Sequence, residues 1–108
     1  MLQMRTYLRA KRLNKHGEAI LNFIVSPGDH WVTTGIAMAS AYWDSLSETI
    51  SKRHPDYFRV NSLYQLYKSR AMQCISNYKF KNTAFDKKYF EQYIFKGKEQ
   101  TENPYFFM

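Results

Sequence analysis

Residues 4–35 decide the fold, and they read MRTYLRAKRLNKHGEAILNFIVSPGDHWVTTG. The stretch predicts three short β-strands joined by two tight turns. In its first part, basic and aromatic side chains alternate with smaller or apolar ones, a period of two that places each set on one face of a strand. The two sets are Arg5, Tyr7, Arg9 and Lys11, and Thr6, Leu8 and Ala10.

Two turn signals separate the predicted strands. Residues 14–17 (Asn-Lys-His-Gly) include residue types that tolerate positive φ. In residues 27–29 (Pro-Gly-Asp), the proline fixes φ at its own position and the glycine permits a wide range of φ at the next. The second strand has an apolar face formed by Ala19, Leu21, Phe23 and Val25. A third strand is predicted from His30 to Thr34, because this segment is rich in β-branched and aromatic residues. The result is an antiparallel meander with one apolar face and one basic, aromatic face.

Length and composition narrow the class of protein. A chain of 108 residues is expected to form one domain with a modest core. No apolar run is long enough to cross a bilayer, and the first residues lack the pattern of a secretory signal. The single cysteine, Cys74, excludes an internal disulfide and a cysteine-based zinc cage. We therefore expect a soluble, cytoplasmic protein.

The net charge of +7 is unevenly distributed along the chain. Residues 1–35 carry an excess of basic residues over Glu18 and Asp29, and residues 61–82 carry basic residues and no acid. The basic residues are Arg5, Arg9, Lys11, Arg12 and Lys15 in the first segment and Lys68, Arg70, Lys79 and Lys81 in the second. The rest of the chain balances to zero. Such a concentration of positive charge is typical of a surface that binds a polyanion.

Two helices are predicted after the meander. The first is long, with an N-cap at Asn61 or Ser62, and apolar residues recur along it up to Tyr78 over about five turns. Its apolar stripe is expected to pack on the apolar face of the meander, because each needs that cover. A shorter helix is predicted over residues 85–95 and is ended by Gly97. The predicted fold class is α+β: a three-stranded antiparallel sheet packed on one long C-terminal helix, with a second, shorter helix.

The segment between the meander and the long helix is less regular. Ser40 is expected to cap a short helical turn leading to Trp43, which we expect to be anchored in the core. Residues 45–51 (SLSETIS) fit either a fourth short strand or irregular structure. Pro55 biases the residue before it away from helix, which predicts a loop.

The sequence contains few residues in patterns that are typical of an active site. His16, His30 and His54 fall in predicted turns or loops and lack the spacing of a zinc-binding helix. Cys74 lies on the apolar stripe of the long helix and is expected to be a buried, inert thiol. The sequence has no Gly-rich phosphate loop and no nucleophile elbow. We identify no active site, metal site or cofactor site.

The basic face of the meander is the better candidate for function. The side chains expected on it are Arg5, Arg9, Lys11, Asn22, Trp31 and Thr33. A β-ribbon fits the major groove of B-DNA, where Arg can bind guanine and Asn can bind adenine. Arg12, Lys15 and His16, at the first turn, are expected near the phosphate backbone. An ordinary solvated face that only aids solubility is an equally weighted alternative. Ile20 and Ile24 are expected on this same side, either against thymine methyl groups or under another element.

The order and spacing of several motifs resemble a known family. The motifs are Tyr7-Leu8-Arg9, Asn14-Lys15-His16-Gly17-Glu18, the strand Ile20 to Val25, Thr33-Thr34-Gly35-Ile36, Trp43-Asp44, and Pro55-Asp56-Tyr57 with Asn61. Together they resemble the amino-terminal arm-binding region of tyrosine recombinases, the integrases of bacterial conjugative transposons and prophages. Residues 102–107 (ENPYFF) look like the beginning of the next domain in that family.

The resemblance implies an arm-type DNA-binding domain over residues 1–95, followed by a linker and the truncated start of a core-binding domain over residues 96–108. It implies that a three-stranded sheet enters the major groove of arm-type sites in double-stranded DNA, while catalysis belongs to a domain outside these residues. Other recombinase protomers would be partners through such further domains. The DNA-contacting positions that it implies are Arg5, Tyr7, Arg9, Lys11, Asn22, His30, Trp31 and Thr33.

Three other functions remain open from the sequence. A protein-interaction module would use Tyr7, Trp31 and the aromatic tail of residues 105–108. A small nuclease or toxin would use the histidines. A single-stranded nucleic-acid binder would stack bases on the exposed aromatic side chains.

Overall fold

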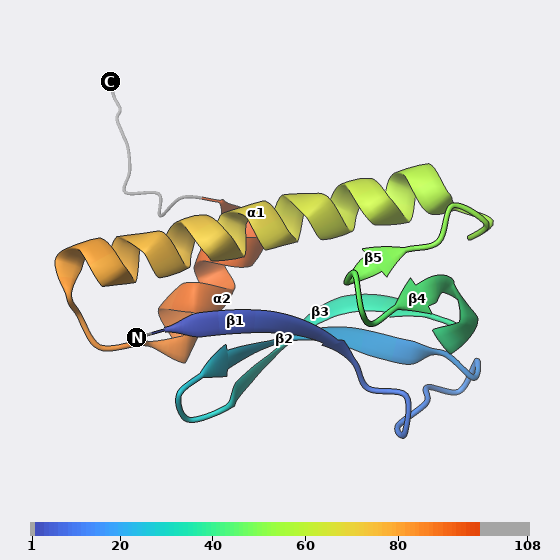
Figure 1. Ribbon diagram of the computed structural model, residues 1–108, viewed down its shortest axis with the longest axis horizontal. Coiled ribbons are helices and arrows are strands. Elements are labelled where there is room, and N and C mark those ends of the chain that lie inside the picture. The colour runs from blue at the N-terminus through green and yellow to red at the C-terminus, as the bar shows by residue number, and fades with distance from the viewer. Residues whose placement is uncertain (1, 98–108) are drawn as a thin grey trace. The chain divides into compact units, whose positions relative to one another are not determined.

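The computed structural model describes residues 2–97, and this part of the chain has an α+β architecture (Figure 1). Its elements, in chain order, are β1 (Gln3–Leu8), β2 (Ala19–Ser26), β3 (His30–Met38), the 3-10 turn η1 (Ser40–Tyr42), β4 (Trp43–Asp44), β5 (Thr49–Ile50), α1 (Tyr57–Lys81) and α2 (Lys87–Lys96). The described chain forms two compact units that divide between Gln65 and Leu66, within α1. The first unit contains the strands, and the second contains most of α1 and all of α2.

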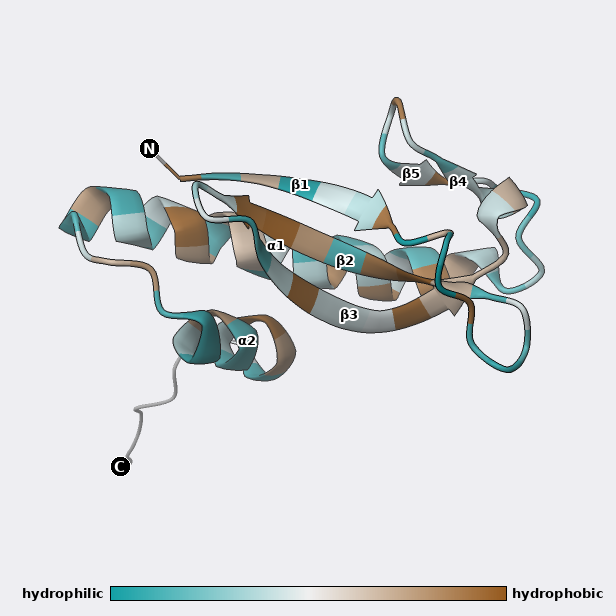
Figure 2. Cartoon of the chain, turned by 90° about the horizontal axis from the view of Figure 1, so that it is seen from below, coloured by the Kyte–Doolittle hydropathy of each residue, from teal (hydrophilic) through white to brown (hydrophobic). Residues whose placement is uncertain are grey.

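The first three strands form one antiparallel sheet in the order β1-β2-β3, with β2 in the centre. Residues paired directly across strands share a face of the sheet. The pairs run Thr6–Phe23–Val32 on one side, which we call the core face, and Arg5–Ile24–Trp31 on the other, which we call the outer face. Figure 2 colours β2 mostly as hydrophobic and β1 mostly as hydrophilic. The predicted three-stranded meander is confirmed.

The first part of α1 packs on the core face of the sheet. Leu21, Phe23 and Val25 on β2 are completely buried. The ring of Tyr64 stacks on the ring of Phe23, with centroids 6.5 Å and planes 26° apart, and Val60 on the same helix is also buried. Removal of this apolar area from water is the main favourable term in folding. The predicted packing of helix on sheet is therefore confirmed for the residues of α1 that belong to the first unit.

A bulge interrupts the pairing of β2 with β3. Asn22 pairs with Thr33 and Ile20 pairs with Ala37, so residues 34–36 stand opposite the single residue Leu21. The buried hydroxyl of Thr34 donates to the carbonyl oxygen of Leu21 at 2.9 Å and accepts from the N–H of Ile36 at 3.1 Å. The backbone can accommodate the extra residues because Gly35 adopts a φ of 77°, a conformation that costs glycine little.

The first strand is shorter than the sequence pattern predicts. It ends at Leu8, whereas the alternation of residue types continues to Lys11. The N–H of Arg9 still donates to the carbonyl oxygen of Ile20 at 3.1 Å, which carries the pairing one residue further. Beyond that point the chain turns, because the N–H of Ala10 donates to Leu8 and the N–H of Arg12 donates to Arg9. The placement of Lys11 on the strand is therefore wrong.

Residues 43–50 form a small β-hairpin, which settles the ambiguous segment. β4 pairs with β5 through Trp43–Ile50 and Asp44–Thr49. Trp43 is half-buried, and its ring meets the ring of Tyr64 edge-on at 5.6 Å. The carboxylate of Asp44 accepts from the hydroxyl of Ser47 and from the N–H groups of Leu46 and Ser47, and these bonds lower the pKa of Asp44 below its ordinary value.

The long helix begins earlier than predicted and is not the last helix. α1 starts at Tyr57 rather than beside Asn61, and α2 follows it. The carbonyl oxygen of Asp56 accepts the N–H of Val60 at 3.0 Å, the first bond of helical spacing, while the N–H of Asp56 donates to Nδ1 of His54 at 3.0 Å. These bonds fix the chain immediately after Pro55, and the loop predicted before the helix is confirmed. The α+β fold class with one long and one shorter helix is confirmed.

The second unit joins the end of α1 to α2. Asp86 caps α2, with its side chain accepting from the N–H groups of Lys88 and Tyr89. The helix ends at Gly97, whose φ is 87° and whose N–H donates to the carbonyl oxygen of Tyr93, and this confirms the predicted stop. The guanidinium of Arg70 on α1 donates to the carbonyl oxygen of Ile94 at 2.9 Å. The expected boundary at residue 96 and the aromatic tail, residues 105–108, fall at or beyond the limit of the described residues.

Candidate nucleic-acid interface

The outer face of the sheet brings together most of the side chains expected to bind DNA. The register places Arg5 opposite Ile24 and Tyr7 opposite Asn22. It also places Trp31 opposite Ile24 and Thr33 opposite Asn22. Arg5, Tyr7 and Thr33 are exposed to solvent. The side chains that the period of two assigns to one face of these strands therefore do lie on one face.

Two aromatic rings meet above the central strand. Tyr7 belongs to β1 and Trp31 to β3, strands that stand about 10 Å apart because β2 lies between them. Their ring centroids are nevertheless only 5.6 Å apart, in an edge-to-face arrangement with an interplanar angle of 87°. The rings must therefore reach across β2. This accounts for the burial of Ile24 on the outer face, where it is only 1% exposed. Ile24 is therefore covered by side chains of the two neighbouring strands, rather than by another element as one of the two expected alternatives had it.

A guanidinium group lies over each ring. The Cζ atom of Arg5 lies 5.7 Å from the ring centroid of Tyr7, and the Cζ atom of Arg9 lies 5.1 Å from that of Trp31. Both distances are within the range in which the negative face of an aromatic ring attracts a cation. Arg5, Tyr7, Trp31 and Arg9 thus form a continuous row across the outer face. We refer to these four residues as the cation–aromatic cluster.

The positive charge on this side of the sheet is not neutralised within the described chain. β1, β2 and β3 contain no Asp or Glu. In residues 2–97 an ion pair is found between Arg59 and Asp56, at the start of α1, and none involves a basic residue of residues 5–15. The strands therefore carry positive charge and no acid on this face, as expected of a surface that attracts a polyanion.

The loop from β1 to β2 presents further cations. Asn14 organises it: its side-chain oxygen accepts from the N–H groups of His16 and Glu18, at 2.9 and 3.0 Å, and its own N–H donates to the carbonyl oxygen of Glu18 at 2.8 Å. This hydrogen bonding holds the predicted turn together. The exposed side chains that the loop carries are Lys11, Arg12, Lys15 and His16. They extend the basic surface beyond the end of β1.

Two of the predicted contact residues do not face solvent on this surface. Asn22 is on the outer face but only 7% exposed, and its amide donates to the carbonyl oxygen of Ile20 at 3.0 Å. His30 pairs with Val25 and so lies on the core face, on the opposite side of the strand from Trp31. Adjacent residues of a strand point to opposite faces, so His30 and Trp31 cannot both line one surface. In their place, Gln3 is exposed and extends the outer face two residues before Arg5.

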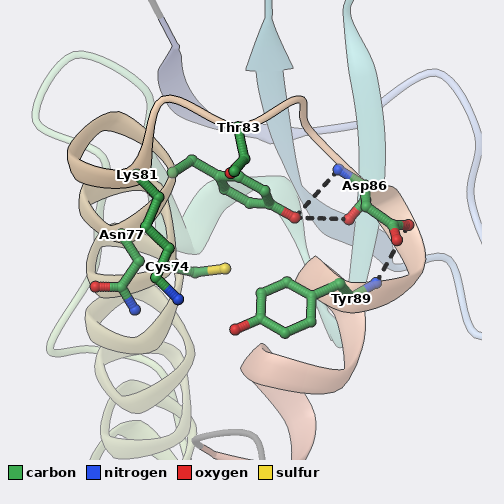
Figure 3. Close-up of a pocket in the computed structure, with 7 residues that line it drawn as sticks. Cys74, Asn77, Lys81, Thr83, Asp86 and Tyr89 are labelled. Atoms are coloured by element: carbon green, nitrogen blue, oxygen red, sulfur yellow. Dashed lines mark hydrogen bonds between the residues drawn. The ribbon is translucent and has the colours of Figure 1, made fainter.

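The second unit contains a cavity of about 290 Å³ between the end of α1 and the start of α2 (Figure 3). The side chains that line it are Cys74, Asn77, Tyr78, Lys81, Thr83, Asp86 and Tyr89. The hydroxyl of Tyr78 both donates to the carbonyl oxygen of Asp86 and accepts its N–H, each at 3.1 Å. Cys74 is completely buried, as predicted. The polar groups here join two helices, and this gives the cavity a structural role.

The three histidines lie in different parts of the structure. His16 is in the β1–β2 loop, His30 is the first residue of β3, and His54 lies before α1 with its ring 5.0 Å from that of Tyr42. Among residues 2–97, no three His, Cys, Asp or Glu side chains are grouped so that they could hold a metal ion. Within the same residues, neither helix has the length and apolar character needed to span a membrane.

Comparison with known proteins identifies no family for this chain. No protein-family model, no curated protein and no solved structure matches it. The likeness to the arm-binding region of tyrosine recombinases therefore stays a prediction from the sequence motifs. The function proposed below is argued from the geometry and charge of the outer face.

Proposed function

We propose that this chain binds double-stranded DNA through the outer face of its sheet, with β1 and β3 directed into the major groove. The observation that carries the proposal is the cation–aromatic cluster. It holds two guanidinium groups, those of Arg5 and Arg9, on an acid-free surface of a three-stranded sheet. Arginine is the side chain that most often makes specific contacts with DNA bases, because its fork of N–H donors matches guanine O6 and N7.

The dimensions of the sheet suit this groove. Neighbouring strands lie about 4.8 Å apart, so three strands span roughly 10 Å, and the major groove of B-DNA is about 12 Å wide. The flanking β1–β2 loop then meets the groove edge, where Arg12 and Lys15 are available to the phosphates. Such contacts position a protein on DNA and carry no sequence information themselves.

Two observations favour duplex DNA over the alternatives. One face of each ring in the cluster is covered by a guanidinium group, so a base of a single strand could stack there only after displacing it. A purely apolar protein partner would leave the unpaired charges of Arg5 and Arg9 without a counterion. Duplex DNA supplies both paired guanine acceptors in the major groove and phosphate charge along its edges.

The resemblance to tyrosine recombinases supports a more specific assignment within the same proposal. The ordered motifs and the three-stranded sheet followed by a long helix are those expected of an arm-binding module that works in the cytoplasm of a bacterium. The module would tether recombinase protomers to accessory sites, while a separate domain performs strand exchange. Tethering raises the effective concentration of the linked domains at the core site, so the arm contact itself need not be tight.

A fluorescence anisotropy titration tests the proposal. Labelled double-stranded and single-stranded DNA of the same sequence are titrated at salt concentrations from about 50 to 200 mM. We expect the duplex to bind more tightly and its affinity to fall steeply with salt, because each neutralised phosphate contributes about −0.9 to the logarithmic slope. Arg5→Ala and Arg9→Ala should each weaken duplex binding.

The matched control is Arg53→Ala, which removes an exposed arginine from the loop before α1, outside the sheet. It should leave duplex affinity nearly unchanged. Unaltered binding by both Arg5→Ala and Arg9→Ala would contradict the assignment of the outer face. Tighter binding to the single strand than to the duplex would favour base stacking instead.

A further inference from the structure

The arrangement of the cation–aromatic cluster separates the side chains that can touch DNA from those that hold them in place. Arg5 and Arg9 stand at the two ends of the row, and Tyr7 and Trp31 form its middle. Tyr7 is 39% exposed and Trp31 is half-buried, and the two rings stand nearly perpendicular to each other, with an interplanar angle of 87°. Each ring therefore serves as a separate aromatic platform for one guanidinium group.

An aromatic platform restricts the orientation of an arginine. A guanidinium group is planar, and when it lies against a ring its N–H donors stay free at its edges. An arginine without such support loses much side-chain freedom when it binds, and that loss weakens the complex. A phosphate accepts hydrogen bonds from donors that approach from many directions. The paired acceptors of guanine need both donors of the arginine in one plane. Pre-orientation should therefore matter for base recognition much more than for phosphate contact.

We propose that Tyr7 and Trp31 are specificity-determining positioning residues, which orient Arg5 and Arg9 to read guanine bases in the major groove. The inference rests on the proposed binding of duplex DNA by the outer face. It adds that sequence is read from β1 and the residue directly after it, with β3 supplying a positioning ring, and not from β2. Two outward side chains in the middle of β2 support this division, because Ile24 is 1% exposed, Asn22 is 7% exposed, and the Asn22 amide is bonded to the backbone.

The test is a measurement of discrimination. The full chain selects its preferred duplex from a pool of random sequence, and its affinity for that duplex is then compared with its affinity for an unrelated duplex of equal length at one salt concentration. We expect guanine to be enriched at two positions of the selected duplex. Loss of one well-formed arginine–guanine pair should lower the ratio of the two affinities roughly 5- to 150-fold.

Two kinds of variant separate positioning from charge. Trp31→Leu and Tyr7→Leu keep an apolar cover over β2 but remove the ring. Each should lower the discrimination ratio roughly two- to tenfold, with a smaller loss of affinity for the unrelated duplex and an unchanged salt slope. Trp31→Phe restores a ring and should restore most of the ratio. Arg9→Lys keeps the charge but loses the paired donors, and should lower the ratio at least as much as Trp31→Leu does.

The possible results distinguish this inference from the proposed function. Failure of the unmodified chain to bind any duplex would overturn both. Duplex binding with a discrimination ratio that Tyr7→Leu and Trp31→Leu leave intact would overturn the positioning role alone. An equal loss of affinity for both duplexes, with no rescue by Trp31→Phe, would also overturn it, because that pattern reports damage to the sheet.

Discussion

The hydroxyl of Tyr64 on α1 donates a hydrogen bond of 3.1 Å to Oγ1 of Thr6 on β1, a residue 58 positions earlier in the chain. The same hydroxyl lies 3.1 Å from the carbonyl oxygen of Glu48, in the turn of the β4–β5 hairpin. Tyr64 is completely buried, and its ring contacts Phe23 and Trp43. One side chain therefore ties together the helix, the sheet and the hairpin of the first unit.

We expect Tyr64→Phe to lower the free energy of unfolding by about 1–3 kcal/mol, because it keeps the ring contacts but leaves the hydroxyl of Thr6 and the carbonyl of Glu48 without this partner. Urea denaturation followed by circular dichroism measures the change. Tyr42→Phe is the matched control, since Tyr42 is half-buried and its ring contacts His54. It should cost no more than about 0.5 kcal/mol. Equal effects of the two variants would show that the Tyr64 hydroxyl adds nothing.

The stability of the protein should fall at alkaline pH. Burial raises the pKa of Tyr64 above 10.0, an effect that the charge of Glu48 increases and the Thr6 hydrogen bond opposes, and burial likewise raises the pKa of Tyr78. Above pH 10.0 the folded chain therefore binds more protons than the unfolded chain, and stability decreases as pH rises. The contribution is fully present below the ordinary tyrosine pKa and is lost as pH rises through the folded-state values.

Absorbance titration of tyrosinate should show a fraction of tyrosines that ionises only above the ordinary range. Urea midpoints measured on either side of pH 10.0 should decrease with pH in the unmodified chain and decrease less in Tyr64→Phe. A urea midpoint that is independent of pH in this range would contradict the assignment of raised pKa values to these two tyrosines.

The local pattern predicts the faces of the strands well but not where they end. The meander is predictable from the alternation at Arg5 and Tyr7 and from the turn at residues 14–17. When one face of a strand is buried, the alternation decides which side chains point to the core. The same alternation continues to Lys11, where no strand exists. The end of β1 is decided by the turn bonds around Arg9, and residue type says nothing about them. Likewise, Asn61 is a good capping type, but the bonds of Asp56 start α1 earlier.

The sequence predicts most of the residues that form the candidate site, but not how their side chains contact one another. Strand periodicity places Tyr7 and Trp31 on one face, yet their contact depends on the register of two strands that are far apart in sequence. Burial of Asn22 under this contact could not be read from the sequence, because a polar residue on a predicted solvent face is normally exposed. The position of His30 on the core face is predictable from the sequence, because strict alternation places it on the opposite face from Trp31.

The bulge in β3 should depend on the backbone freedom of Gly35. Its φ of 77° is unfavourable for residues with a Cβ atom, although an added Cβ would meet nothing within 4 Å. We therefore expect Gly35→Ala to lower the free energy of unfolding by about 1 kcal/mol or more, entirely through backbone strain. Gly35→Asn should cost less, because asparagine tolerates positive φ better than alanine. Thermal denaturation of the two variants measures the difference, and a larger loss in the asparagine variant would point to crowding at this site instead.

The cations of the β1–β2 loop should contribute affinity without specificity. Arg12 and Lys15 are exposed and lie outside the strands, which suits contact with phosphates rather than with base edges. We expect Arg12→Gln and Lys15→Gln each to weaken binding to all duplexes by a similar factor and to reduce the logarithmic salt slope by about one. Their discrimination ratio should stay that of the unmodified chain, in contrast to Arg9→Lys.

Lys52→Gln serves as the control for these loop variants. Lys52 is exposed in the loop before α1, and its substitution removes the same charge from the same unit. If long-range attraction by net charge were the whole effect, all three variants would weaken binding alike, since each lowers the net charge by one. A reduced salt slope for Arg12→Gln and Lys15→Gln but not for Lys52→Gln would instead indicate direct phosphate contacts. The salt slope counts released counterions and so distinguishes contact from distant attraction.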